Sequence, residues 1–346
     1  MENDVQSKLL SFFKSRGMPR REGNITIPDL VKITDGWENE VYSFKMEYEE
    51  TGKQEDLILR IYPGDDAIWK SAREFNAMKR LHEVGFPVPG VLLLESGDSP
   101  FGKPFVIMEK INGRIMGHVI DRSSEEKRKE LVTQSCKMFV ALHALDWKLF
   151  ASDPLPYETT DPFGFIKYTL SSARNSVDRF QRGEFARPVL DWLEARVSDV
   201  PCERLSVIHG DYHPYNIILR DDGAAFVIDW GNFGIADFRI DLAWTLLLVS
   251  TYGHPEAREI VLDEYERIAG RKVEQIEYFE VFAIARRLFS ILMSLSDGAT
   301  KMGMRPGAEA MMKQNVGHIK TVYALLREKT GIAVPDVETL ISNLSG

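Results

Sequence analysis

Cysteine is scarce in this sequence of 346 residues, which contains only Cys136 and Cys202. The two are far apart and each stands among apolar residues, which is typical of reduced, buried thiols in a protein of the cytoplasm. No spacing of cysteine and histidine indicates a zinc site, and there is no internal repeat or low-complexity tract. The scarcity argues against a disulfide-stapled fold and predicts a cytoplasmic location.

Long apolar runs and an excess of positive charge are also missing. The longest apolar stretch, Leu242 to Val249, is too short to span a bilayer. The N-terminus, MENDVQSKLL, is acidic where a signal peptide would be basic and then apolar. The formal net charge of -9 disfavours a general nucleic-acid or membrane binder, because both favour a basic surface. We therefore expect neither nucleic acid nor a membrane as partner.

The apolar pattern divides the chain into a strand-rich part and a helical part. A hydrophobic fraction of 44% over 346 residues allows two cores. The pattern predicts an α+β protein with two lobes, an N-terminal antiparallel sheet lobe over residues 1–112 and a mainly helical lobe over 113–346. Strands are expected at 25–33, 41–48, 57–62, 91–95 and 104–109, and helices near 5–13 and 68–84, at 124–143 and over most of the chain beyond it.

The stretch from Ser206 to Asp241, SVIHGDYHPYNIILRDDGAAFVIDWGNFGIADFRID, holds most of the candidate catalytic residues. Apolar runs and a turn predict strand, loop, strand, turn and strand. His209, Asp211 and Asn216 fall in the loop, and Asp229 ends the third strand. The order His-x-Asp-x4-Asn, followed by an aspartate after the next hairpin, is that of a kinase catalytic loop and its metal-binding aspartate.

Phosphoryl transfer accounts for these residue types. A triphosphate with its Mg²⁺ needs hard oxygen ligands, which Asn216 and Asp229 supply. The acceptor hydroxyl needs a carboxylate that orients it and takes its proton, and Asp211 has the required position. Two carboxylates about 5 Å apart repel by roughly 3 kcal/mol at an effective dielectric near 20, so a cation is expected to join them. We predict Mg²⁺ as cofactor and ATP, or another nucleoside triphosphate, as co-substrate.

The same residues also have a plainer interpretation. A lone His-x-Asp is usually structural, and the His-x-Asp-x4-Asn pattern alone is a weak signal. Asp221 and Asp222 beside Gly223 are turn residues. The strands on both sides of the loop, with Asp229 at the end of the hairpin, favour phosphotransfer.

The segments HGDYHPYN and VIDWGNFGIADFRIDLA closely resemble the catalytic and metal-binding segments of the aminoglycoside phosphotransferase family, which includes choline, ethanolamine and homoserine kinases. In that family, a triad such as Ile228-Asp229-Trp230 stands where protein kinases carry Asp-Phe-Gly. The resemblance implies a protein-kinase-like fold with a nucleotide cleft between two lobes. It also implies structural roles for Asp241, which would steady the catalytic loop, and for His209, which would hold the loop together.

Arg60 lies on the strand where protein kinases carry a lysine that binds phosphate. Choline-kinase-like members resemble this chain in using arginine, and a guanidinium can bind phosphate bidentately and also pair with a carboxylate. Glu74, on the following helix, is the candidate partner of Arg60. Its alternative is a solvated charge beside Arg73.

Two further segments are expected at the nucleotide. The hairpin DGWENEVYSF occupies the place of the glycine-rich loop, and position in the family would let Asn39 and the backbone near Gly36 face the phosphates, although a single glycine is a weak motif. The segment PFVIMEKINGR reads as a strand running into the linker between the lobes. In the family this linker binds adenine, so Glu109 and Ile111 would offer main-chain groups, and Met108 would line the pocket or be plain core.

We therefore expect an ATP-dependent phosphotransferase that moves the γ-phosphate to a hydroxyl group of a small molecule. A protein kinase is the second hypothesis, but only eleven residues separate Asp229 from Asp241 and no Ala-Pro-Glu follows. A catalytically silent nucleotide-binding module is the third hypothesis. The presence of Asp211, Asn216 and Asp229 together disfavours it.

The identity of the acceptor stays open. Tyr168, Trp192 and Trp244 could each stack on a ligand or belong to a core. The mild acidic excess over residues 256–297 fits a solvated face better than a binding site for a cation.

Overall fold

The computed structural model describes residues 2–17, 24–33, 39–151, 155–179, 186–202, 204–295 and 316–345. The described residues form two compact units. The first contains the residues up to Arg114 together with Ile217–Gly231, and the second contains Ile115–Asn216 and the residues from Asn232 onward. By its contacts, the hairpin that follows the catalytic loop thus belongs with the N-terminal residues. Sequence patterning alone places that hairpin in the C-terminal lobe.

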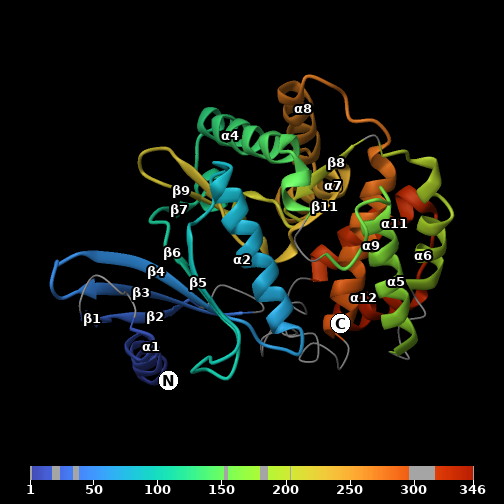
Figure 1. Ribbon diagram of the computed structural model, residues 1–346. Coiled ribbons are helices and arrows are strands. Elements are labelled where there is room, and N and C mark those ends of the chain that lie inside the picture. The colour runs from blue at the N-terminus through green and yellow to red at the C-terminus, as the bar shows by residue number, and fades with distance from the viewer. Residues whose placement is uncertain are drawn as a thin grey trace. The chain divides into compact units, whose positions relative to one another are not determined.

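The first unit is built on an antiparallel sheet with the strand order β1-β3-β4-β6-β5, in which β2 also pairs with β3 (Figure 1). Burial alternates along the two longest strands, because successive side chains of a strand point to opposite faces. The α+β class expected from the apolar pattern is confirmed. The strands are β1 (Ile25–Thr26), β2 (Leu30–Ile33), β3 (Glu40–Tyr48), β4 (Gln54–Ile61), β5 (Val91–Glu95) and β6 (Phe105–Glu109).

Helix α1 (Glu2–Ser15) packs on one face of this sheet. Its buried residues, among them Leu9 and Phe12, form one core with the inward-facing residues Leu59 and Phe105. The rings of Phe12 and Phe105 meet edge to face with their centroids 5.3 Å apart. Since Leu59 points into this core, its neighbour Arg60 points to the opposite face of the sheet.

Helix α2 (Ala67–Glu83) contacts β5 and β6. Its buried positions include Ser71, Glu74, Met78 and Leu81, which recur at helical spacing. The carboxylate of Glu74 therefore lies on the buried face of the helix, where an apolar side chain would be usual. Its hydrogen-bond partners must come from the protein. The helix is followed by Gly85 at φ 78, where the missing Cβ allows a left-handed backbone.

The hairpin of β9 (Ile217–Leu219) and β10 (Ala225–Val227) adds β7 (Arg114–Ile115) to make a small sheet of order β10-β9-β7. After β10 the chain is held against the N-terminal residues. Val227 N donates to the carbonyl of Pro87 at 2.9 Å. The ring of Trp230, which is fully buried, meets that of Phe86 edge to face at 5.9 Å.

The second unit is mainly helical. The last strand before the catalytic loop, β8 (Leu205–Ile208), pairs with β11 (Gly234–Asp237) in a two-stranded antiparallel sheet. Figure 1 shows α4 beside α8, and α9 contacts α7, α6 and α11. The helices are α3 (Met116–Asp121), α4 (Glu125–Ala144), α5 (Gly164–Arg179), α6 (Arg187–Glu194), α7 (Phe238–Leu248), α8 (Ala257–Ala269), α9 (Ile276–Leu295), α11 (Val316–Thr330) and α12 (Pro335–Ser345).

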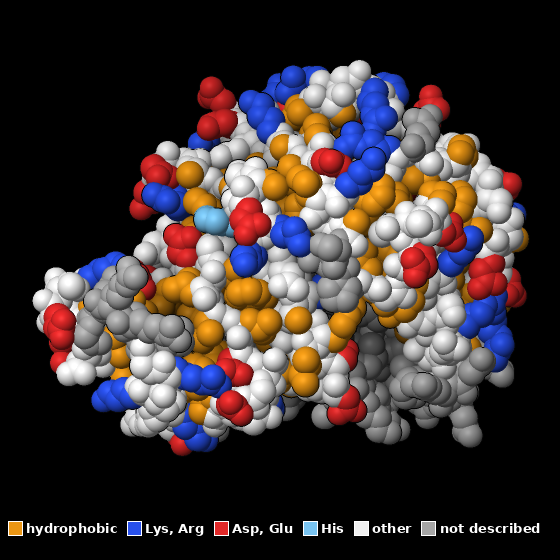
Figure 2. Space-filling view, viewed as in Figure 1, with side chains coloured by type: hydrophobic (Ala, Val, Ile, Leu, Met, Phe, Trp, Pro, Cys, Tyr) orange, Lys and Arg blue, Asp and Glu red, His pale blue; other side chains and the backbone are white. Residues whose placement is uncertain are grey.

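The two cysteines differ from expectation in one respect. Cys136 is buried on α4, but Cys202 is only half-buried, so the prediction of a second buried thiol was wrong. Cys202 lies in the loop before β8. Within the described ranges, no helix combines the length and the hydropathy needed to cross a bilayer. Acidic and basic side chains are interspersed over the face seen in Figure 2.

The core of the helical unit contains a histidine that links its stability to pH. His318 stacks on Tyr252, and its Nε2 accepts a hydrogen bond from Arg287 Nε at 2.9 Å. Burial, together with the Arg287 cation, lowers the pKa of His318 to about 4 from an ordinary 6.5. As pH falls from 6.5 to 4, His318 becomes protonated in the unfolded chain but stays mostly neutral in the folded protein. This difference lowers the free energy of unfolding by about 3 kcal/mol at pH 4.

We expect His318→Gln to remove most of this loss, so that the free energy of unfolding falls less steeply with acidification than in the wild type. Urea unfolding at several pH values between 4 and 7 measures the slope. His82→Gln, at an exposed position on α2, is the control and should keep the wild-type slope. If the free energy of unfolding of His318→Gln depended on pH as it does in the wild type, His318 would not be the cause of the loss of stability in acid.

Candidate active site

The catalytic loop begins where β8 ends, and a buried carboxylate fixes its backbone. Asp241, on α7, accepts hydrogen bonds from the backbone N–H groups of His209 at 2.7 Å and Gly210 at 2.9 Å. The imidazole of His209 is fully buried, and its Nδ1 accepts the N–H of Asp211 at 3.1 Å. A Cβ on Gly210 would lie 2.5 Å from the carbonyl oxygen of Asn232, so only glycine fits this turn. Asp241 and His209 thus orient the backbone that carries Asp211.

Asp211 presents a carboxylate that is held on one side and 27% exposed. Its Oδ1 accepts a hydrogen bond from the indole Nε1 of Trp244 at 2.7 Å. Burial alone would raise the pKa of Asp211, but three neighbours lower it below its ordinary value: His213, whose Nε2 lies 3.7 Å from Oδ1, the hydrogen bond from Trp244 and the charge of Arg286. The group is therefore ionised at neutral pH. Such a weak base acts mainly by orienting a hydroxyl group and accepting its proton late in the reaction.

The amide nitrogen of Asn216 is bound within the loop. Its Nδ2 donates to the carbonyl oxygen of Asp211 at 2.9 Å and lies 3.2 Å from His213 Nε2. These bonds fix the amide nitrogen toward the loop. The amide oxygen, which is the hard ligand that a magnesium ion would need, points to the other side.

In the first unit, Arg60 joins two of the predicted residues into one network. Its Nη1 donates to Glu74 Oε1 at 2.5 Å and its Nη2 donates to Asp229 Oδ1 at 2.7 Å. The hydroxyl of Tyr62 donates to Glu74 Oε2 at 2.7 Å. Although burial lowers the pKa of Arg60, the carboxylates of Glu74 and Asp229 raise it well above its ordinary value, so the guanidinium stays charged. Arg60 therefore interacts with two carboxylates, and the Arg73 cation also acts on Glu74.

Asn39 belongs to the same network. With its amide oxygen turned toward Arg60, Asn39 accepts hydrogen bonds from Nε and Nη2 at 2.8 Å each. Its position beside the phosphate-binding candidate Arg60 is compatible with the predicted place near the nucleotide. Gly36, which was predicted with it, lies outside the described residues.

Asp229 has a backbone conformation that L-residues seldom adopt. Its φ is 68°, in the left-handed region, which costs about 1 kcal/mol for a residue with a Cβ. The chain after it is held by Arg73, whose guanidinium donates to the carbonyl of Gly231. The carboxylate of Asp229 is 45% exposed and keeps room for a further ligand beside Arg60. Strain of this kind concentrates at functional positions.

The residues predicted for the adenine linker lie at the end of β6. Met108 and Ile111 are both 7% exposed. The N–H of Glu109 donates to the carbonyl of Gly90 at 2.8 Å, so this N–H is already used and the carbonyl is the main-chain group that Glu109 could offer. Their role toward adenine stays a prediction.

The predicted metal ligands are hard oxygen donors of the kind that Mg²⁺ prefers, and a nucleotide would supply further oxygens. In the described part of the chain, no three residues of the types His, Cys, Asp and Glu gather as they would around a metal held by protein alone. The roles of Asp229 and Asn216 toward Mg²⁺ stay a prediction.

Two residues of the site were missed as such from the sequence. Trp244 was noted only as an aromatic that could stack on a ligand, and Arg286 was not singled out. Trp244 binds Asp211, and the guanidinium carbon of Arg286 lies 4.0 Å from the centroid of the Trp244 ring. Trp244 follows Asp241 by three residues on one helix, which was the available signal. Arg286 lies on α9, and no local pattern connects it with the catalytic loop.

The buried pairing of Glu74 gives a testable stability effect. We expect Glu74→Gln to lower the free energy of unfolding by about 3 kcal/mol, because it leaves the buried Arg60 guanidinium with one carboxylate fewer. Urea unfolding measures the change. Glu83→Gln, at an exposed position on the same helix, is the matched control and should stay within about 0.5 kcal/mol of wild type. Equal stability of the two variants would show that the pairing contributes little.

Comparison with known proteins identifies related sequences. A family model described as the phosphotransferase enzyme family matches residues 29–276, well over half of the chain. Acyl-CoA dehydrogenase family member 11 of Rattus norvegicus is 28% identical over 213 residues, which cover 59% of this chain and 24% of that protein. The chain spans only about a fifth to a quarter of the length of the curated relatives that it matches.

Comparison of structures identifies the fold. A putative aminoglycoside phosphotransferase from Ralstonia eutropha matches with a TM-score of 0.65 at 17% identity, over 93% of this chain and 97% of the other. A thermostable mutant of aminoglycoside phosphotransferase APH(4)-Ia, solved with ADP and hygromycin B, matches with a TM-score of 0.55 at 18% identity, over 95% and 100% of the two chains. These matches confirm the predicted protein-kinase-like fold.

Proposed function

Because the chain belongs to the phosphotransferase enzyme family, we propose that it is an ATP-dependent kinase that phosphorylates a hydroxyl group of a small molecule. The observation that carries the proposal is the state of Asp211. Its carboxylate is ionised and partly exposed, Trp244 holds one of its oxygens, and Asp241 and His209 fix its backbone. A loop held in this way suits the alignment of an acceptor for in-line attack.

In the proposed reaction the acceptor oxygen attacks the γ-phosphorus of ATP, and the bond from that phosphorus to the bridging oxygen of the β-phosphate breaks. ADP leaves with the electron pair of that bond, and the hydroxyl proton passes to Asp211 Oδ2. Arg60, positioned by Glu74, offers a permanent positive charge to the phosphates. When bound, Mg²⁺ supplies charge neutralisation of the triphosphate, and Asn216 and Asp229 are the residues that we propose as its ligands.

A protein of the same fold was solved with ADP and hygromycin B, which supports this proposal. Because the sequence identity is below 25%, the acceptor of that protein cannot be assigned to this chain. A protein kinase is disfavoured because a 3-10 turn (Trp230–Asn232), β11 and α7 follow Asp229 in close succession, with no long segment to dock a peptide. A silent binding module would not need the held and ionised Asp211.

The test is an ATP-consumption screen over aminoglycosides, choline, ethanolamine, homoserine, sugars and nucleosides, with Mg²⁺ omitted as the control. We expect ADP to form only with Mg²⁺ and with a particular class of acceptor. Calorimetric ATP binding without turnover over the whole panel, including acceptors of the class inferred below, would favour the silent module instead.

A further inference from the structure

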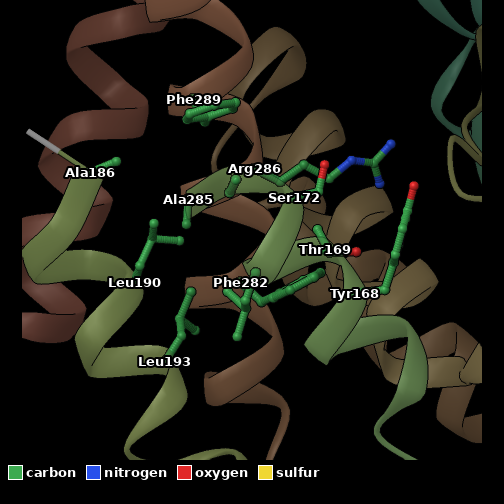
Figure 3. Close-up of a pocket in the computed structure, with 12 residues that line it drawn as sticks. Tyr168, Thr169, Ser172, Ala186, Leu190, Leu193, Phe282, Ala285, Arg286 and Phe289 are labelled. Atoms are coloured by element: carbon green, nitrogen blue, oxygen red, sulfur yellow. The ribbon is translucent and has the colours of Figure 1, made fainter. Parts of the chain in front are cut away.

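The helical unit contains a cavity lined mostly by apolar side chains. It has a volume of about 240 Å³ and lies among α5, α6 and α9 (Figure 3). An apolar cavity of about 150 Å³ is already enough to take up a benzene molecule, so this one has room for a larger apolar group. Its apolar part includes Leu190, Leu193, Phe282, Ala285 and Phe289.

The polar groups of the cavity gather at one end. Figure 3 shows the head groups of Arg286, Tyr168, Ser172 and Thr169 on the side away from Leu190. Among the described residues that line the cavity, none is an aspartate or a glutamate. The cavity is therefore amphipathic, with a long apolar part and a polar end whose charge is positive.

Arg286 connects this polar end with the catalytic loop. Its guanidinium stacks on Trp244, whose Nε1 in turn holds Asp211, so a single indole ring joins the two. The guanidinium makes no hydrogen bond or ion pair with any residue in the described part of the chain. The charge of Arg286 interacts with the carboxylates of Asp211 and Asp241 through space, but neither accepts a hydrogen bond from it. The N–H donors of the guanidinium are therefore available, and an anionic group of a ligand is a natural acceptor for them.

We infer that the acceptor is an alcohol with an apolar body and one anionic group. The apolar body fills the cavity, the anionic group meets Arg286, and the hydroxyl group is presented to Asp211. This inference rests on the proposed kinase function. A polyamine alcohol such as an aminoglycoside is disfavoured, because the cavity offers its ammonium groups a guanidinium and no carboxylate.

The test uses unreactive probes, so that it does not depend on turnover. Binding of hexanoate, octanoate, decanoate, decanol and decylamine to the full chain is measured by calorimetry. We expect decanoate to bind more tightly than decanol and decylamine, and each methylene that enters the cavity to tighten binding about fourfold. Equal binding of decanoate and decylamine, or no dependence on chain length, would overturn the inference.

Matched variants locate the two parts of the site. Arg286→Gln is expected to lower the affinity for decanoate about tenfold and to leave the affinity for decanol unchanged. Its control is Arg287→Gln, because the neighbouring guanidinium points to Tyr252 and His318 instead of the cavity. Ala285→Phe fills the cavity and should abolish the dependence on chain length, whereas Ala195→Phe, at the exposed end of α6, should not. Retention of that dependence in a folded Ala285→Phe variant would place the apolar body elsewhere.

The two hypotheses fail in different ways. If the carboxylates bind with the expected dependence on charge and chain length, but hydroxylated analogues of decanoate are not phosphorylated, the assignment of the cavity is supported and the proposed kinase function is not. Turnover of a polycationic acceptor, with no binding of the carboxylates, would leave the kinase standing and overturn the inference about its acceptor.

Discussion

Asp211→Asn is expected to lower kcat by about 10²- to 10⁴-fold, the range typical for the loss of a positioned proton acceptor. Asparagine keeps an oxygen that can accept the hydrogen bond from Trp244, so the loop geometry should survive. It lacks the negative charge that orients the hydroxyl group and receives its proton. Because the backbone is fixed by Asp241 and His209, the free energy of unfolding should change by less than about 1 kcal/mol.

ADP formation with the acceptor found by the screen measures this effect, and urea unfolding measures stability. The matched control is Asp221→Asn, the same chemical change at an exposed turn position, which should retain wild-type kcat. A folded Asp211→Asn variant with near-normal turnover would show that another group takes the proton.

Asp241→Asn is expected to lower the free energy of unfolding by about 3 to 5 kcal/mol. The carboxylate is 0% exposed and accepts two backbone N–H groups, one on each oxygen. An asparagine has only one acceptor oxygen, so its amide nitrogen would face either the N–H of His209 or that of Gly210. A buried donor left without an acceptor costs about 1 to 3 kcal/mol, and the lost charge adds to this.

Urea unfolding of the variant tests the expectation, with Asp263→Asn at an exposed position of α8 as the control. Any folded Asp241→Asn protein should also have a lower kcat, because the backbone that carries Asp211 is no longer fixed. A loss of stability below about 1 kcal/mol would show that the loop does not depend on this carboxylate.

Local patterns in the sequence were enough to predict most of the elements. Apolar patterns predicted β3 to β6, and the helix expected at 124–143 is α4, whose N-cap Ser124 accepts the N–H of Lys127 at 3.4 Å. These signals are local because a strand's alternation and a helix's cap depend on neighbouring residues. The pairing of Arg60 with Glu74 was expected from the family resemblance, and the structure places the two at 2.5 Å.

Features that depend on distant contacts were not predicted. Strand β11 was missed, because Gly234 and Ala236 are weak strand formers and the strand exists by pairing with β8. The roles of Trp244 and Arg286 at Asp211 come from the packing of α7 and α9, which no spacing within the catalytic loop encodes. The cavity likewise requires α9 to pack beside α5 and α6, which lie far from α9 in the sequence. The catalytic loop was predictable because its candidate residues lie close together in the sequence, whereas the cavity was not.

The most direct measurement follows the label from γ-labelled ATP into the acceptor, with and without Mg²⁺, in the wild type and in Asp211→Asn. We predict that label appears on the acceptor hydroxyl in the wild type with Mg²⁺ and falls at least a hundredfold in the variant. Label that is released only as free phosphate, or transfer that is equal in Asp211→Asn, would contradict phosphoryl transfer by this loop.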